Sequence, residues 1–195
     1  MSNPLRDRRP VTELAATGQV IEFAKQISGF KGLVAVLEAD LAALDPEKMP
    51  STWRENLVSG ALQFGYADAA GRVVKLTGSA DVTVAAVCQR CLEPCELTLC
   101  IEPELLLLAA DAGAVVEGSE ELEVWELDEH EVRPQDIVEE LLIMAMPFSA
   151  MHDNMTECKA LSSADSSADE EIQKLVNPFA DLRSQMQQNE KDPDT

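Results

Sequence analysis

Apolar residues repeat at helical spacing in three segments of the chain. The first predicted helix covers residues 11–28, although Gly18 interrupts it. The second covers residues 32–44 (GLVAVLEADLAAL), where the leucines and valines form one stripe and the acids face away. The third and clearest covers residues 133–147 (RPQDIVEELLIMAMP), with a proline in its first turn and Pro147 at its end.

Between the second and third helices the hydrophobic period changes to two. Short alternating runs follow one another across tight turns: NLVSGALQFGYA, RVVKLTG, SADVTVAAVCQRC and CELTLCIEPELLLLA. Strands in direct succession are typical of an antiparallel meander or a partly closed barrel. We therefore expect an α+β fold in which the helix at 133–147 is a core helix packed on the sheet.

Changes in composition divide the chain into five parts. Residues 1–10 are predicted to be a flexible tail, and residues 11–158 a single α+β domain. Residues 159–174 are polar, acidic and of low complexity, which is typical of a disordered linker. Residues 175–187 are predicted to be a short amphipathic C-terminal segment with helical spacing, followed by a tail at 188–195.

Net charge is the strongest global signal. The chain has 36 acidic and 15 basic residues, for a formal net charge of −21. Proteins that coat nucleic acid gain affinity from Lys and Arg on phosphates, so extensive RNA contact is disfavoured. The negative electrostatic field of so acidic a protein attracts basic proteins instead. The acidic residues 111–131 are predicted to be a solvated loop and an edge strand, or, alternatively, a docking surface for a basic partner.

The sequence favours a cytoplasmic location. Its longest apolar run, residues 105–110, has the length of a strand and is too short for a membrane helix. The basic N-terminus lacks the apolar region of a secretory signal. The five cysteines are an odd number, which does not suggest a disulfide framework, so we expect reduced thiols.

The cysteine-rich stretch AAVCQRCLEPCELTLCI carries the candidate chemistry. Cys88 and Cys91, separated by two residues in a predicted hairpin turn, supply half of a tetrahedral zinc site. His152 and Cys158 complete it if the helix at 133–147 returns the chain to the hairpin tip. The alternative is a reduced hairpin with a structural role and no metal.

Other uses of these thiols are less well supported. Cys95 is close enough to contribute a ligand, whereas Cys100 lies roughly 16 Å up the return strand at about 3.3 Å per residue. A redox CxxC normally precedes a helix, and here a strand follows. A catalytic cysteine needs a base, and neither His130 nor His152 can be placed beside one. The chain also lacks a phosphate-binding glycine loop, so we expect neither an enzyme nor a small-molecule substrate.

Several blocks of the sequence resemble one protein family. The strand and turn LTGSADVTVAAVCQRCLEP, the helix RPQDIVEELLIMAMP with a trailing His-Asp pair and Cys158, and the terminal NPFADL occur in the order of the YceD family. These are the large ribosomal RNA subunit accumulation proteins of bacteria and plastids. The resemblance covers residues 20–186 and is closest to the proteobacterial branch. The CxRC pair of the family corresponds to Cys88, Arg90 and Cys91.

The resemblance implies a non-enzymatic factor in ribosome biogenesis that supports synthesis, processing or stability of 23S rRNA. Many members outside the proteobacterial branch carry a cysteine-rich segment after the core helix, where this chain keeps His152 and Cys158. Because the chain is strongly acidic, we hypothesise that it acts through a basic protein, such as a ribosomal protein or a processing or assembly factor, with 23S rRNA contacted indirectly.

Two other functions stay open. One is direct RNA binding through Arg90 at the hairpin tip and the basic N-terminal tail. The other is a nuclease that uses acids with a divalent metal, although no paired-carboxylate spacing stands out. Candidate contact residues come from the hairpin turn and the C-terminal segment: Gln89, Arg90, Asn177, Pro178, Phe179 and Leu182.

Overall fold

The computed structural model describes the chain in five stretches: residues 3–68, 71, 73–109, 122–127 and 129–158. It comprises two compact units, Met1–Asp153 and Asn154–Thr195. The predicted linker, the C-terminal helix and the tail lie outside the described residues, as do Asn177, Pro178, Phe179 and Leu182. In the second unit the structure describes residues 154–158, which contain one 3-10 turn, Met155–Glu157.

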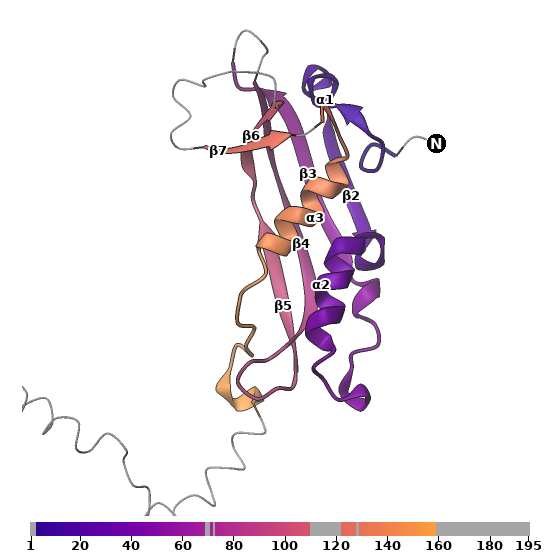
Figure 1. Ribbon diagram of the computed structural model, residues 1–195, viewed down its shortest axis with the longest axis vertical. Helices are drawn as coiled ribbons and strands as arrows, with labels where there is room; N and C mark the ends of the chain where they lie inside the picture. The colour runs from indigo at the N-terminus through magenta and orange to yellow at the C-terminus, as the bar shows by residue number, and fades with distance from the viewer. Residues whose placement is uncertain (1–2, 69–70, 72, 110–121, 128, 159–195) are drawn as a thin grey trace, which may run out of the picture. The chain divides into compact units, whose positions relative to one another are not determined.

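A six-stranded sheet forms the centre of the first unit (Figure 1). Its strands are β2 (Val20–Gln26), β3 (Leu57–Tyr66), β4 (Val74–Val87), β5 (Pro94–Ile101), β6 (Glu104–Ala109) and β7 (Glu123–Leu127). The order is β2-β3-β4-β6-β7, with β5 also paired to β4. All pairs are antiparallel except β6 and β7, which run parallel.

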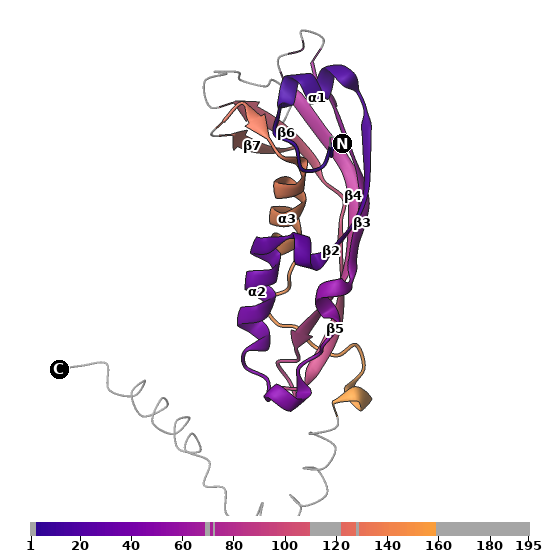
Figure 2. The ribbon, with the colours of Figure 1, turned by 90° about the vertical axis from the view of Figure 1, so that its right-hand side faces the viewer.

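The predicted antiparallel succession is confirmed for β3, β4 and β5, and the sheet does not close into a barrel. Strand β4 is long enough to pair with two strands in succession: Val74–Thr77 pairs with β6, and Ala80–Val87 pairs with β5. The path ends at β2 and β7, which are not hydrogen-bonded to each other, so the sheet stays open. Helices α2 and α3 cover one face of it, as Figure 2 shows. This is a two-layer α+β arrangement.

The first predicted helix, residues 11–28, is only half right. Helix α1 (Val11–Thr17) ends at Gly18, whose φ of 56° is left-handed and whose N–H donates to the carbonyl of Ala15. A left-handed glycine is a common helix terminator, and it turns the chain into β2. The strand then alternates between exposed and buried positions, a two-residue period that the helical interpretation overlooked.

The other two predicted helices are confirmed with small changes in their ends. Helix α2 is Lys31–Leu41, and helix α3 is Pro134–Met144. They pack on each other and on the sheet, and α3 is a core helix as predicted. A carboxylate oxygen of Glu139 on α3 accepts a hydrogen bond of 2.9 Å from the N–H of Leu33. This contact satisfies one of the unpaired amides in the first turn of α2.

Strands β3 and β4 approach each other closely at two glycines. A Cβ on Gly78 would lie 2.2 Å from the carbonyl oxygen of Ala61, and a Cβ on Gly60 would lie 2.2 Å from that of Ser79. Such contacts are far shorter than van der Waals separation, so only glycine fits. Gly78 belongs to the LTGSADV segment that leads into the cysteine hairpin.

The N-terminal residues that the sequence assigns to a tail make specific contacts from Asn3 onward. The Leu5 side chain is 4% exposed, and its carbonyl accepts a hydrogen bond of 2.9 Å from the N–H of Gln135. Strand β1 (Arg9–Pro10) pairs with β8 (Glu131–Val132) in a separate two-stranded sheet. The described part of the chain contains no helix long and apolar enough to cross a bilayer.

Candidate metal centre

The CxxC sequence lies in the turn between β4 and β5, as predicted. The N–H of Cys88 donates to the carbonyl of Glu93 at 2.9 Å, and the N–H of Leu92 donates to the carbonyl of Cys88 at 2.8 Å. Leu92 has a left-handed φ of 59°, which reverses the chain directly after Cys91. Neither thiol lies at the start of a helix, so the dipole that activates redox CxxC motifs is missing here.

The segment after α3 runs along this turn, as the hypothesis of a metal site requires. The N–H of Gln89 donates to the carbonyl of Ala150 at 2.8 Å. The guanidinium Nη2 of Arg90 donates to the carbonyl of His152 at 3.1 Å. Helix α3 therefore returns the chain to the hairpin tip, and one main-chain hydrogen bond and one from the Arg90 side chain hold it there (Figure 1).

His152 is oriented with one ring nitrogen toward the thiols. Its Nδ1 lies 3.5 Å from Sγ of Cys91, and its Nε2 lies 3.2 Å from the carbonyl oxygen of Pro94. A carbonyl can only accept, so Nε2 carries the proton and Nδ1 presents a lone pair. Metal-binding histidines are commonly held by a hydrogen bond of this kind from the distal nitrogen.

The first unit therefore brings together three potential metal ligands. The ligand atoms of Cys88, Cys91 and His152 all lie within 4.8 Å of one another, and the Cys91 side chain is only 9% exposed. Cys158, which the sequence assigns to the same ligand set, lies in the second unit, six residues beyond His152 and directly after the turn Met155–Glu157. These are the four residues that the sequence singled out.

The remaining two cysteines have different surroundings. Cys100 is exposed on β5, opposite Asp81, and is not part of the group, in agreement with the distance expected for a regular strand. Cys95, which the sequence left as an optional ligand, is buried and is also outside the group.

The pKa values of the buried thiols differ for identifiable reasons. Burial raises the pKa of Cys88, but hydrogen bonds from the amides of His152, Cys91 and Arg90 outweigh it and lower that pKa to about 5. Burial, together with the negative charge of Cys88, raises the pKa of Cys95 to about 11. The turn therefore favours a thiolate at Cys88 and a neutral thiol at Cys95, and a thiolate is the form that binds metal.

Arg90 is less accessible than a contact residue at a hairpin tip is expected to be. Its side chain is partly buried against the segment after α3, and its Nε is buried with no hydrogen-bond partner among the described residues. Gln89 is exposed, and its side-chain amide donates to the carbonyl of Val87 at 3.3 Å. The described geometry thus gives Arg90 a positioning contact with His152.

One anchor of the hairpin was not predicted. A carboxylate oxygen of Asp40, at the end of α2, accepts a hydrogen bond of 2.9 Å from the N–H of Val87, the residue before Cys88. The sequence places Asp40 on the polar face of a helix and gives no sign of this contact, because the contact depends on how α2 crosses the sheet.

A β-hairpin with a CxxC turn and a returning histidine is an arrangement that small Cys/His zinc-binding modules also use. Residues 76–184 match the family model described as large ribosomal RNA subunit accumulation protein YceD. The match covers more than half of the chain, so the protein belongs to the YceD family, as the resemblance indicated. No characterised protein and no solved structure matches the chain significantly. The family description implies a role in accumulation of the large-subunit ribosomal RNA.

Proposed function

We propose that this protein is a non-enzymatic factor that supports the synthesis, processing or stability of 23S rRNA in the cytoplasm and acts through a basic protein partner. Membership of the YceD family is the observation that carries the proposal. The net charge of −21 supports an indirect route to RNA, because an acidic surface repels phosphates and attracts basic proteins. The partner would be a ribosomal protein or a processing or assembly factor.

The alternative of direct RNA binding through Arg90 has weaker support from the geometry. Contact with a phosphate needs an accessible guanidinium, and Arg90 is partly buried with Nη2 donating to the carbonyl of His152. Two of the three N-terminal arginines are likewise engaged: Arg8 lies 2.8 Å from Glu129 and Arg9 lies 2.6 Å from Glu13.

Two measurements test the function. Deletion of the gene should lower the ratio of 23S to 16S rRNA, and the wild-type protein should restore it. Affinity purification from lysate, with and without nuclease, should recover the same basic large-subunit protein or assembly factor. An unchanged rRNA ratio contradicts the role in accumulation, whereas loss of all partners after nuclease treatment contradicts the protein-mediated route.

For the cofactor, we propose that Cys88, Cys91, His152 and Cys158 hold a structural zinc ion. Three thiolates and one imidazole are a common ligand set for tetrahedral zinc, with no position left for a substrate. The inference is supported by the proton on Nε2 of His152, which makes Nδ1 the ring nitrogen that faces the thiols, and by the burial of Cys88 and Cys91. Such an ion would fasten the segment after α3 to the hairpin.

Elemental analysis tests this proposal directly. Protein purified in reducing, chelator-free buffer should contain about one zinc per chain. Replacement of Cys158 by serine should remove the metal, whereas the same replacement at Cys100, which is exposed on β5, should not. A zinc content near zero in the wild-type protein rejects the site, and retention of full zinc by the Cys158 variant rejects Cys158 as a ligand.

A further inference from the structure

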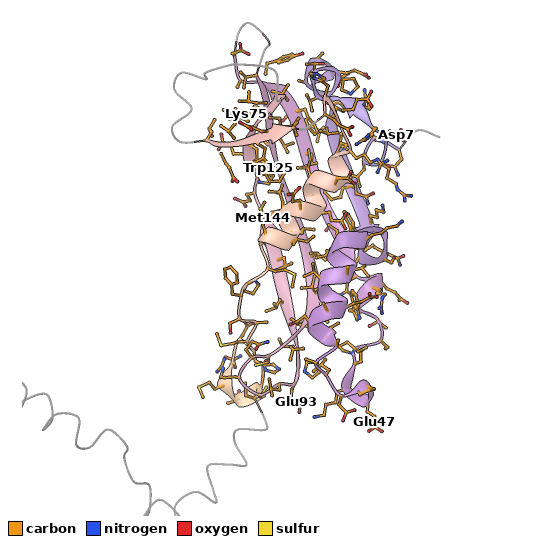
Figure 3. All side chains as sticks on the ribbon, viewed as in Figure 1. Asp7, Glu47, Lys75, Glu93, Trp125 and Met144 are labelled. Atoms are coloured by element: carbon orange, nitrogen blue, oxygen red, sulfur yellow. The ribbon has the colours of Figure 1, made fainter. Side chains whose placement is uncertain are left out.

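A groove of about 580 Å³ lies along strand β7 and helix α3, and the metal centre does not use it. Its apolar part includes Trp125, Ile137 and Met144, and Figure 3 shows the first and last of these labelled on β7 and α3. Met144 is 55% exposed, and Val124, which also lines the groove, is 41% exposed. Large apolar side chains exposed together, with a polar rim, are typical of interaction surfaces.

The groove follows the edge of β7. Consecutive residues of this strand, Val124 to Leu127, all line it, although neighbouring side chains in a strand point to opposite faces. A groove lined from both faces must run beside the backbone edge. Among the described strands, β7 pairs only with β6 and ends the order of the sheet. An end strand offers N–H and C=O groups that can pair with an added strand.

The rim of the groove carries more carboxylates than its own arginine side chains can neutralise. Five carboxylates and two arginines line it. Arg8 pairs with Glu129 at 2.8 Å, and Arg133 lies 3.9 Å from Asp136. The three remaining carboxylates are exposed and have no ion-pair partner within the described stretches: Glu126, Glu131 and Glu140.

We infer that this groove is the docking site for an extended basic segment of the partner protein, which adds to the edge of β7. Its Lys and Arg side chains would lie on the unpaired carboxylates, and an apolar side chain between them would contact Trp125. Main-chain pairing supplies affinity and the side chains supply selectivity in this mode of recognition. The inference rests on the proposed action through a basic partner and specifies its surface.

A matched pair of charge reversals separates docking at the groove from general attraction. The groove variant replaces Glu126, Glu131 and Glu140 by lysine. The control variant makes the same replacement at three exposed glutamates outside the groove: Glu22, Glu47 and Glu96. Both change the net charge equally. The probe is a fluorescent peptide of about eight residues that alternates lysine and valine, and its dissociation constant is measured by anisotropy.

The groove variant should bind this peptide at least about tenfold more weakly, and the control variant should be within about twofold of the wild type. A second peptide of the same sequence, methylated on the backbone nitrogen of one central lysine and one central valine, lacks a hydrogen-bond donor on each of its two edges and should also bind about tenfold more weakly. Equal weakening in both variants, or equal binding of both peptides, overturns docking by strand addition.

Cell assays separate failure of this inference from failure of the proposed function. In the deletion strain, the control variant should restore the ratio of 23S to 16S rRNA, whereas the groove variant should not. Full rescue by the groove variant overturns the assignment of the partner surface and leaves the proposed function intact. If the deletion itself leaves the ratio unchanged, the proposed function fails, and the peptide measurements decide the groove independently.

Discussion

Replacement of Cys91 by serine tests how much the proposed zinc ion contributes to the thermal stability of the protein. The variant loses one thiolate, while a hydroxyl of similar size keeps the turn filled. A ligand that binds only the folded state stabilises it by about 2.7 kcal/mol when its free concentration is a hundredfold above its Kd. For a domain of roughly 150 residues, each kcal/mol shifts Tm by about 2–4 °C. Chelation of zinc should therefore lower the wild-type Tm by about 5–11 °C.

The variant should respond differently to the same treatment. Scanning calorimetry with and without chelator should give two equal Tm values for the Cys91 variant, because it has no metal to lose. Its Tm should lie slightly below that of the chelated wild type, because the lost contact with Nδ1 of His152 lowers the free energy of unfolding by about 1 kcal/mol more. Replacement of Cys100 by serine is the control and should keep the full chelator shift. A wild-type Tm that chelator leaves unchanged refutes the reasoning.

Two further predictions concern the hairpin and its supporting strands. Replacement of Gly78 by alanine should lower the free energy of unfolding by about 1–3 kcal/mol in urea titrations, because the new Cβ meets a carbonyl oxygen 2.2 Å away. The same change at Gly65, where no atom lies within 4 Å of the new Cβ, should be neutral or stabilising by up to about 1 kcal/mol. Equal losses of stability in the two variants would contradict the steric cause. Iodoacetamide at pH 8, followed by mass spectrometry, should label exposed Cys100 quickly and leave Cys95 unlabelled, since the Cys95 thiol is buried and its pKa is raised to about 11. Comparable labelling rates at the two cysteines would contradict the burial of Cys95.

The residues of the proposed metal site could be found from the sequence because their geometry is mostly local. Cys88 and Cys91 are separated by two residues between alternating runs, and any hairpin that joins those runs places both at its tip. His152 lies eight residues beyond the end of α3, close enough in sequence for the helix to determine where it returns. What the sequence could not give is the tautomer of His152, because it depends on the carbonyl of Pro94.

The elements that could not be predicted correctly from the sequence are strands whose hydrogen-bonding partners lie far away along the chain. Residues 20–26 continue an apolar pattern compatible with a helix, and they become β2 because β3 offers them an antiparallel partner along their whole length. The parallel pairing of β6 and β7 could not be predicted for the same reason. The polar, acidic stretch between the two strands contains nothing that specifies their relative direction. The groove beside β7 was therefore also beyond reach, although the sequence had singled out its acidic residues as a possible docking surface.

Helix α3 connects the two proposed sites without making them dependent on each other. Its outer residues Ile137, Glu140 and Met144 line the groove, and the segment after its C-terminal end carries His152 to the hairpin. In Figure 3, Trp125 beside the groove and Glu93 in the hairpin turn lie toward opposite ends of the sheet. Three buried residues of α3 that do not line the groove, Val138, Leu141 and Leu142, hold the helix in the core. Loss of the proposed zinc ion should therefore release the segment after α3 while the groove keeps its shape, so a defect in peptide binding can be attributed to the groove itself.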